Sequence, residues 1–141
     1  MKDQHFGDYT FTCHRFRFRR KGVMPLLAQT YWAKMRKWST VRRSIRGAIP
    51  FGVFDAHGKQ VGFARVVTDC STTYYLADVV IDESLRGKGV GIAFLRYILS
   101  DPRFNTRRGM LLTQTAHGFY EHEGFQRFGE RLMMREPTDR T

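Results

Sequence analysis

A short segment rich in glycine and cations carries the clearest chemical signal in the sequence. It reads RGKGVG, covers Arg86–Gly91, and separates the apolar run YYLADVVIDESL from the amphipathic run IAFLRYILSD. A helix that begins after such a junction presents unpaired N–H groups and a partial positive charge. Glycines let an anionic group approach this backbone closely, and Arg86 and Lys88 add positive charge. The segment therefore predicts a pyrophosphate-binding site.

Three phosphate-binding motifs compete for this segment. A Walker A loop requires Ser or Thr after GxxxxGK, whereas Gly89 follows Lys88 here. A Rossmann loop requires GxGxxG and an acidic residue at the end of the next strand, and the run MLLTQT ends without one. The pattern R-x-x-G-x-G is matched by Arg86, Gly89 and Gly91. Taken alone, these glycines would also fit a tight turn with no ligand.

A single carboxylate, that of Asp78, interrupts YYLADVVI, the apolar part of the run that precedes the glycine segment. Burying a carboxylate in an apolar strand is costly unless the charge is paired. Two interpretations stay open, because structural ion pairs and functional sites both perturb carboxylates. Asp78 either takes part in a functional site or forms a salt bridge with Arg65.

Cysteine and histidine spacing gives no indication of a metal site. Cys13 and Cys70 are far apart, no CxxC occurs, and HGFYEH does not match HExxH. We expect two reduced, packed thiols and no bound metal.

The elements that must position these groups follow from apolar spacing and from turn residues. Helices are predicted from Pro25 to about Trp38, from Ser39 to about Gly47, from Gly89 to Ser100, and over AHGFYEHEG, which Gly124 closes. Strands are predicted as a hairpin over Ile49–Thr68 and at Tyr9–Phe18, Thr73–Ile81, Met110–Thr115, Phe125–Phe128 and Leu132–Arg135. This order predicts the α/β (α+β) class, with a mixed, mostly antiparallel central sheet covered by helices on both faces. A single domain is expected over residues 1–141.

The charge balance favours anionic partners. Lys and Arg number 24 against 13 Asp and Glu, so the formal net charge is 24 − 13 = +11. The segment RFRFRRK (Arg15–Lys21) interleaves aromatics with cations, as single-strand nucleic-acid binders do. No apolar run approaches the roughly 20 residues of a membrane span, and the first ten residues lack a signal core. We expect a cytoplasmic protein with no membrane partner.

Two motifs in the same order strengthen the pyrophosphate interpretation. LADVVIDESLRGKGVG, followed by TQTAHGFYEHEGF, resembles the GNAT superfamily of acyl-CoA-dependent N-acetyltransferases. In that family an aromatic–Tyr pair on a small helix leads into Gly-Phe, and here these are Phe119-Tyr120 and Gly124-Phe125. The matching segments cover about residues 76–128, and the first forty-odd residues carry no specific match.

The resemblance implies a GNAT-like fold and a role for each matching residue. Tyr120 would donate to the departing thiolate, and Asp78 would orient the amine or deprotonate it through a water. Apart from the resemblance, His117 is a second candidate base, because an imidazole ring titrates near neutrality. A strand N–H of Val79 or Val80 would polarise the thioester carbonyl. Thr113 stands where the family often has Asn, so its side-chain contact to the cofactor arm would be weaker. The positions implied to bind acetyl-CoA are Val79, Val80, Ile81, Arg86, Gly87, Lys88, Gly89, Val90, Gly91 and Thr113.

The acceptor is not identified by the sequence. By resemblance, the first helices border the acceptor pocket, where QTYWAKMRKW offers Tyr31 and Trp32 as substrate-binding residues. Neighbouring cations suit an acceptor that carries a carboxylate or phosphate and do not suit a polyamine. We predict an acetyl-CoA-dependent N-acetyltransferase that acts by direct attack in a ternary complex, as a monomer or homodimer. The alternative is a basic nucleic-acid-binding or acyl-CoA-sensing module without catalysis.

Overall fold

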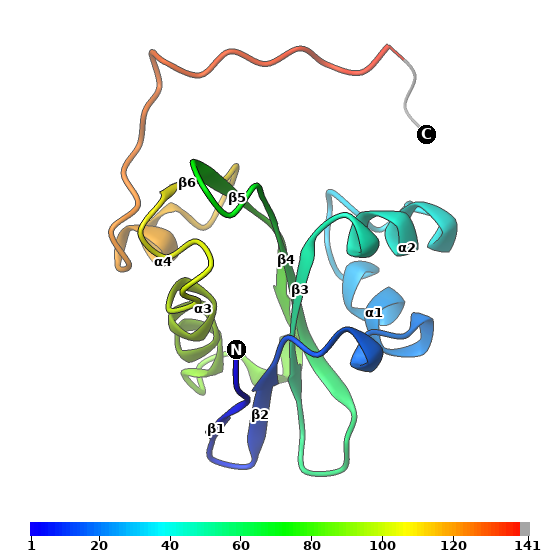
Figure 1. Cartoon of the computed structure of the whole chain (residues 1–141). Coiled ribbons are helices and arrows are strands. Elements are labelled where there is room, and N and C mark those ends of the chain that lie inside the picture. The colour runs from blue at the N-terminus through cyan, green and yellow to red at the C-terminus, as the bar shows by residue number, and fades with distance from the viewer. Residues whose placement is uncertain (139–141) are drawn as a thin grey trace.

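A six-stranded sheet forms the middle layer of the computed structural model, which describes residues 1–138 (Figure 1). Its strands lie side by side in chain order, and every neighbouring pair is antiparallel except β5 and β6, which are parallel. The strands are β1 (Gln4–Phe6), β2 (Tyr9–Thr12), β3 (Ile49–Phe54), β4 (Gln60–Thr68), β5 (Thr73–Ile81) and β6 (Arg108–Met110). The predicted fold class, a mostly antiparallel mixed sheet, is confirmed.

Helices cover both faces of this sheet (Figure 1). On one face lie α1 (Arg20–Leu27) and α2 (Trp38–Arg46), and on the other lie α3 (Val90–Leu99) and α4 (His117–Glu121). Short 3₁₀ turns occupy Arg15–Arg17 and Glu83–Leu85. β5 and β6 are parallel neighbours, so the chain must return between them to the end of the sheet where β5 began. The segment that contains α3 makes this return over one face of the sheet.

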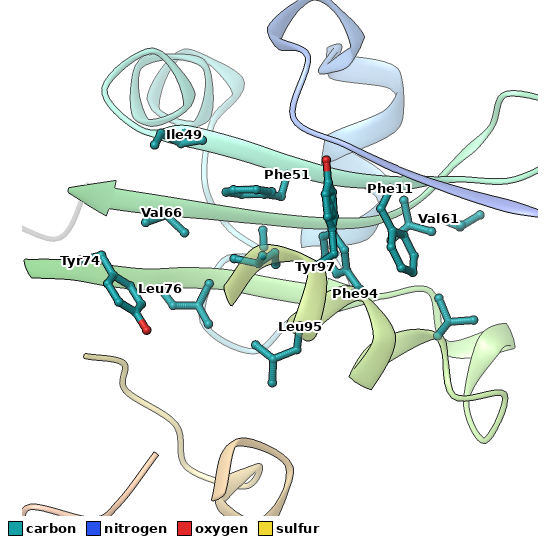
Figure 2. Close-up of a cluster of buried hydrophobic side chains, with 14 of the residues drawn as sticks. Phe11, Ile49, Phe51, Val61, Val66, Tyr74, Leu76, Phe94, Leu95 and Tyr97 are labelled. Atoms are coloured by element: carbon teal, nitrogen blue, oxygen red, sulfur yellow. The ribbon is translucent and has the colours of Figure 1, made fainter. Parts of the chain in front are cut away.

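The core is divided by the sheet into two clusters. The larger cluster lies between the sheet and α3, where Phe11, Phe51, Phe94 and Tyr97 pack ring against ring (Figure 2). A smaller cluster lies between the sheet and the pair α1 and α2. All six residues of β3 are buried, because a central strand covered on both faces needs a continuous apolar run.

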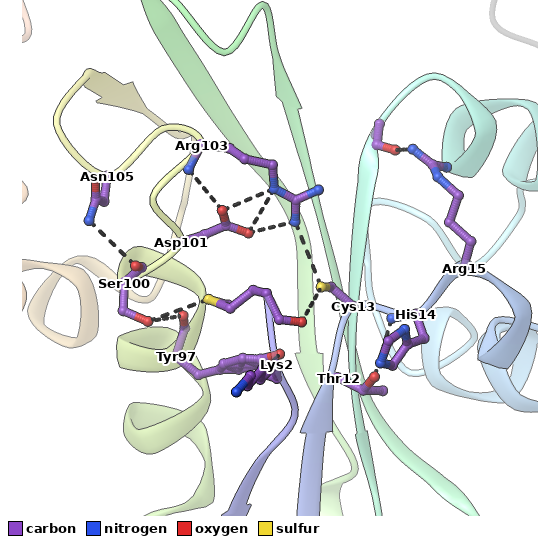
Figure 3. Close-up of polar contacts among 12 residues, drawn as sticks. Lys2, Thr12, Cys13, His14, Arg15, Tyr97, Ser100, Asp101, Arg103 and Asn105 are labelled. Carbon is purple, nitrogen blue, oxygen red and sulfur yellow. Dashed lines mark hydrogen bonds and ion pairs between the residues drawn. The ribbon is translucent and has the colours of Figure 1, made fainter.

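The end of α3 is fixed to the N-terminal segment by buried polar contacts (Figure 3). The Tyr97 hydroxyl donates to the Lys2 carbonyl at 3.1 Å. The Arg103 guanidinium, which pairs with the fully buried carboxylate of Asp101 at 2.6 Å, also donates to the Cys13 sulfur at 3.7 Å, just after β2. These contacts hold α3, and therefore the loop at its other end, in a fixed position against the sheet.

Several of the predicted elements are confirmed closely. The hairpin over Ile49–Thr68 is β3 and β4, and the strand Thr73–Ile81 is β5. The helix predicted from Gly89 to Ser100 is α3, with Gly89 and Ser100 as its two cap residues.

The first predicted helix is wrong in its position. It was expected to begin at Pro25, but α1 spans Arg20–Leu27 and holds Pro25 in its last turn. Val23, Leu26 and Leu27 are all buried, so the apolar face begins before the proline. Residues 28–37 form turns instead, and Thr30 fixes them by donating to the Leu27 carbonyl at 2.8 Å and accepting from the Ala33 N–H at 3.1 Å.

The long strand predicted at Tyr9–Phe18 is also wrong beyond Thr12. β2 ends there, and the chain turns into the 3₁₀ segment Arg15–Arg17. The Arg15 guanidinium donates to the Ile45 carbonyl at 3.0 Å, and this long-range contact holds the chain away from the sheet. Before it, the unpredicted strand β1 pairs with β2 through His5 and Thr10.

The predicted strands near the C-terminus do not form within residues 1–138. β6 covers Arg108–Met110, so the strand predicted at Met110–Thr115 is wrong except at its first residue. Phe125–Phe128 and Leu132–Arg135 have no strand partner, and the chain after α4 runs away from the sheet (Figure 1). Residues there are mostly exposed, so water can form the backbone hydrogen bonds that a neighbouring strand would otherwise form.

Candidate acetyl-CoA site

The glycine segment forms an open loop at the start of α3. Gly87 and Gly89 have φ angles of +79° and +76°, in the left-handed region that glycine adopts without steric cost. Arg86, Gly87, Lys88 and Gly89 are all exposed, and α3 begins at Val90 without a side-chain cap. The N–H groups of its first turn therefore have no acceptor within the helix. An anion placed there would meet these N–H groups and the cations of the loop.

A gap in strand pairing continues from this loop along β5. β5 and β6 pair only through Thr73, Tyr74 and Tyr75, whose partners end at Met110. Beyond Tyr75, the edge of β5 that faces β6 has no strand partner in the described part of the chain. Val79, Val80 and Ile81 lie on this stretch, so their free backbone groups can pair with an extended ligand as a missing strand would.

A β-bulge interrupts β5 beside this gap. Phe63 pairs with Val80 and Arg65 pairs with Ala77, so two residues of β5 oppose Ala64 alone. Asp78 is the bulged residue, and its φ of +57° is a left-handed conformation that Asp adopts more readily than most residues.

The bulge decides which face of the sheet Asp78 occupies. Leu76 packs toward α3, so regular alternation would turn Asp78 toward the same apolar layer. The inserted residue shifts the alternation, and Asp78 points instead to the face covered by α1 and α2.

Asp78 is a fully paired, buried ion. Its side chain is 3% exposed and accepts from Arg65 Nε at 2.6 Å, Arg36 Nη1 at 2.9 Å and Trp32 Nε1 at 3.0 Å. Burial opposes ionisation, but the charges and hydrogen bonds of Arg65 and Arg36 outweigh it, so the pKa of the Asp78 carboxyl lies below its usual value. The salt bridge between Asp78 and Arg65, one of the two interpretations of the sequence, is present, and Arg36 forms a second salt bridge with the same carboxylate.

Asp78→Asn is expected to lower the free energy of unfolding by about 3 kcal/mol, because two buried cations lose their counter-charge. The loss lies at the low end for a broken buried pair, since the side chains of Arg36 and Arg65 are 29% and 16% exposed and can rehydrate. Urea unfolding of both proteins at pH 7 measures it. Unchanged stability would show that the pair contributes nothing to the fold.

The same network predicts a pH dependence of stability. The folded pKa of Asp78 is lowered from 3.8, so its stabilisation is complete above that value and is lost as the pH falls through the lower folded pKa. The stability difference between the native protein and Asp78→Asn should therefore be constant above about pH 5 and shrink below about pH 4. A difference that grows in acid would contradict this sign.

Tyr120 lies on α4 and is partly buried against the sheet face that α3 covers. Its ring packs on Phe119 and Phe125 at centroid distances of 5.0 and 6.0 Å and contacts the larger core cluster. Burial and the nearby Tyr31 phenol raise the pKa of Tyr120 to about 12, so its hydroxyl keeps its proton at neutral pH. Tyr31 belongs to the turn after α1, so the proximity of the two phenols joins the α4 side of the gap to the α1 side.

The remaining predicted residues lie in the turn after α1 and in the segment that leads into and begins α4. Tyr31 and Trp32 are 52% and 42% exposed and stack edge to face at 5.0 Å, so both present aromatic surface to solvent. The Thr113 hydroxyl accepts from the Ala116 N–H at 3.0 Å and so shapes the turn that leads into α4. His117 is the first residue of α4, and no hydrogen bond of its side chain occurs within residues 1–138.

Comparison with known proteins decides the family. The family model described as an acetyltransferase (GNAT) domain matches residues 47–127, more than half of the chain. A crystal structure of a Xanthomonas campestris protein belonging to the GNAT family is 32% identical, with a TM-score of 0.84, and the match covers 92% of this chain and 93% of that one. The chain belongs to the GNAT family of acetyltransferases. A search among curated proteins found no match.

Two other acetyltransferase structures, each less than 25% identical to this chain, show similarity of fold alone. A Trypanosoma brucei acetyltransferase is 21% identical over 92% of this chain and 100% of that one, with a TM-score of 0.69. Glucosamine-6-phosphate N-acetyltransferase from Arabidopsis thaliana is 18% identical over 93% and 99% of the two chains, with a TM-score of 0.65. The GNAT family generally uses acetyl-CoA as co-substrate, together with an acceptor.

The contact between Arg36 and Asp78 was not predicted from the sequence. Arg36 was noted only as a cation near the acceptor region, and its partner Asp78 is 42 residues away in sequence. The signal that could have predicted this contact is charge, because a carboxylate buried within an apolar strand must be paired with basic side chains. Over residues 1–138, no group of His, Cys, Asp or Glu could hold a metal ion, and no helix is both long and apolar enough for a membrane span.

Proposed function

We propose that this GNAT protein is an acetyl-CoA-dependent N-acetyltransferase, with its fold acting as a single catalytic domain. One observation carries the proposal: the exposed start of α3 leads to a stretch of β5 with no strand partner on its β6 side, and α4, which bears Tyr120, packs beside that start through Phe119. The glycine loop would attract the diphosphate at one end of acetyl-CoA. Tyr120 would place a hydrogen-bond donor near the thioester at its other end.

The cofactor would be held by backbone groups more than by side chains. The diphosphate would bind the N–H groups of Gly89, Val90 and Gly91, with Arg86 and Lys88 adding charge at the loop. A Cβ at Gly91 would meet the Phe119 ring at 3.5 Å, an ordinary contact distance, so α4 lies directly beside the start of α3. The pantetheine arm would pair with the free edge at Val79, Val80 and Ile81, where an N–H of Val79 or Val80 would polarise the thioester carbonyl.

The amine would attack the thioester directly in a ternary complex. Its lone pair forms the C–N bond, the carbonyl oxygen takes up charge, and the C–S bond then breaks to release the thiolate. Tyr120 would donate a hydrogen bond to this sulfur. An ordinary alkyl thiol has a pKa of about 8.5, well below the value of about 12 at Tyr120, so the phenol stabilises the thiolate without surrendering its proton.

Asp78 would take part by holding the site rather than by accepting a proton. Its three donors and lowered pKa make it a poor base at neutral pH, so the excess proton of the amine would leave through water. Asp78 would instead fix Trp32 and Arg36 beside the incoming amine.

Ligand stabilisation separates this proposal from a nucleic-acid-binding role. Coenzyme A at about 100 times its Kd should stabilise the native protein by about 2.7 kcal/mol through mass action, which raises Tm. A mixed single-stranded oligonucleotide at moderate salt serves as the comparison. A rise in Tm with the oligonucleotide and none with coenzyme A would reject the proposal in favour of the basic binding module.

A further inference from the structure

The buried cluster around Asp78 carries an excess of positive charge. Two guanidinium groups, those of Arg36 and Arg65, share one carboxylate, which leaves the cluster at 2 − 1 = +1. A single buried carboxylate cannot neutralise two cations, so an additional anion beside them would be stabilised.

Both guanidinium groups also keep unused donors. Arg65 binds Asp78 through Nε alone, and Arg36 binds it through Nη1 alone. Within residues 1–138, their other nitrogens make no hydrogen bond to protein, and none of these nitrogens is sealed from solvent. A guanidinium with free N–H groups fits the two oxygens of a carboxylate or the oxygens of a phosphate.

The free donors are placed and oriented in advance. Asp78 holds both arginines by short hydrogen bonds, so binding an anion costs little side-chain entropy.

The cluster lies next to the expected position of the amine. Trp32 connects the two, because its indole donates to Asp78 while its ring stacks on Tyr31. Tyr31 is in turn close enough to Tyr120 to raise its pKa. A ligand bound along this row would reach from the arginines to the phenol that faces the thioester sulfur.

We infer that Arg36 and Arg65 form a subsite for an oxyanion of the acceptor, so the acceptor is a small primary amine that also carries a carboxylate or a phosphate. This inference rests on the proposed function. The exposed cations Lys34 and Lys37 add to the positive potential and disfavour a polyamine, whose charges would be repelled.

Matched acceptor pairs test the inference with the native protein. Phenylalanine against phenethylamine tests a carboxylate, and phosphoethanolamine against ethanolamine tests a phosphate, with thiol release from acetyl-CoA as the readout. The member that carries the anion should have a kcat/KM at least about tenfold higher in one pair or both, the usual effect of a hydrogen bond between charged groups. Equal or higher values for the amines without an anion would overturn the subsite.

Arg36→Gln tests the residue itself. Asp78 keeps Arg65, so the variant should fold, and its KM for the anionic acceptor should rise by about tenfold or more while its KM for acetyl-CoA stays constant. The KM of Arg36→Lys for the anionic acceptor should lie between those of the native protein and Arg36→Gln, because lysine keeps the positive charge and loses the planar guanidinium that can bind two oxygens at once. Arg46→Gln, at the exposed end of α2, is the control for net charge and should leave both KM values unchanged.

The controls separate failure of the subsite from failure of the proposed function. Transfer to amines regardless of anion, with an unchanged KM in Arg36→Gln, rejects the subsite and leaves the acetyltransferase in place. Absence of both thiol release and coenzyme A binding by calorimetry rejects the proposed function and the subsite with it.

Discussion

Gly89→Val is expected to lower coenzyme A affinity by more than about 100-fold. Gly89 has a φ of +76°, and a residue with a Cβ in this region costs about 1–2 kcal/mol, more for a β-branched side chain. Valine would therefore turn the loop out of its present conformation, and its branched side chain would stand where the diphosphate must approach the backbone. Titration calorimetry with coenzyme A measures the change directly.

The control for this variant is Gly58→Val. Gly58 lies in the turn between β3 and β4 with a φ of +79°, and a Cβ there would meet no atom within 4 Å, so its backbone strain is closely similar. This variant should lose comparable stability and keep its affinity for coenzyme A. If folded Gly89→Val bound coenzyme A as well as Gly58→Val, the loop would not hold the diphosphate.

Tyr120→Phe is expected to reduce kcat by about 10²-fold, the effect of removing one donor from a developing anion in a water-poor site. Affinity for acetyl-CoA should change little, because the hydroxyl acts on the sulfur only as the C–S bond breaks. The ring contacts with Phe119 and Phe125 survive the substitution, so the protein should fold. Steady-state thiol release and calorimetry separate the two quantities.

Tyr74→Phe is the matched control for Tyr120→Phe. Tyr74 lies on β5, and burial raises the pKa of its phenol as well, but its ring packs on Phe104 away from the proposed site. Its kcat should remain near that of the native protein. Equal kcat values for native protein, Tyr74→Phe and Tyr120→Phe would show that water or another group stabilises the thiolate.

Local pattern was sufficient for the middle of the chain. The hairpin β3–β4, the strand β5 and the helix α3 were predictable because apolar spacing and glycine turns agree with the tertiary structure there. Pattern failed where long-range contacts decide the conformation. Alternation in RFRFRR suggested a strand, but Arg15 binds carbonyls 30 and 33 residues away and holds a 3₁₀ turn instead.

The candidate site likewise contains residues that could be predicted from local pattern and residues that could not. The glycine loop before α3 could be predicted from residue types and spacing, because its conformation depends on a short segment of the chain. The catalytic role of Tyr120 was predicted only from the resemblance to a family, because a tyrosine on a short helix is by itself more often a core residue. The contact of Arg36 with Asp78 could not be predicted, because it depends on a β-bulge that turns Asp78 to the other face of the sheet and on a turn that follows α1.

Identification of the acetylated product tests the central proposal most directly. The native protein would be incubated with acetyl-CoA labelled in its acetyl group and with the acceptor panel, and the product examined by mass spectrometry and by treatment with neutral hydroxylamine. We predict one labelled amide, resistant to hydroxylamine, formed in step with free coenzyme A and formed far more slowly by Tyr120→Phe. A hydroxylamine-labile ester, or bound acetyl-CoA that transfers no label to any amine, would contradict N-acetyl transfer.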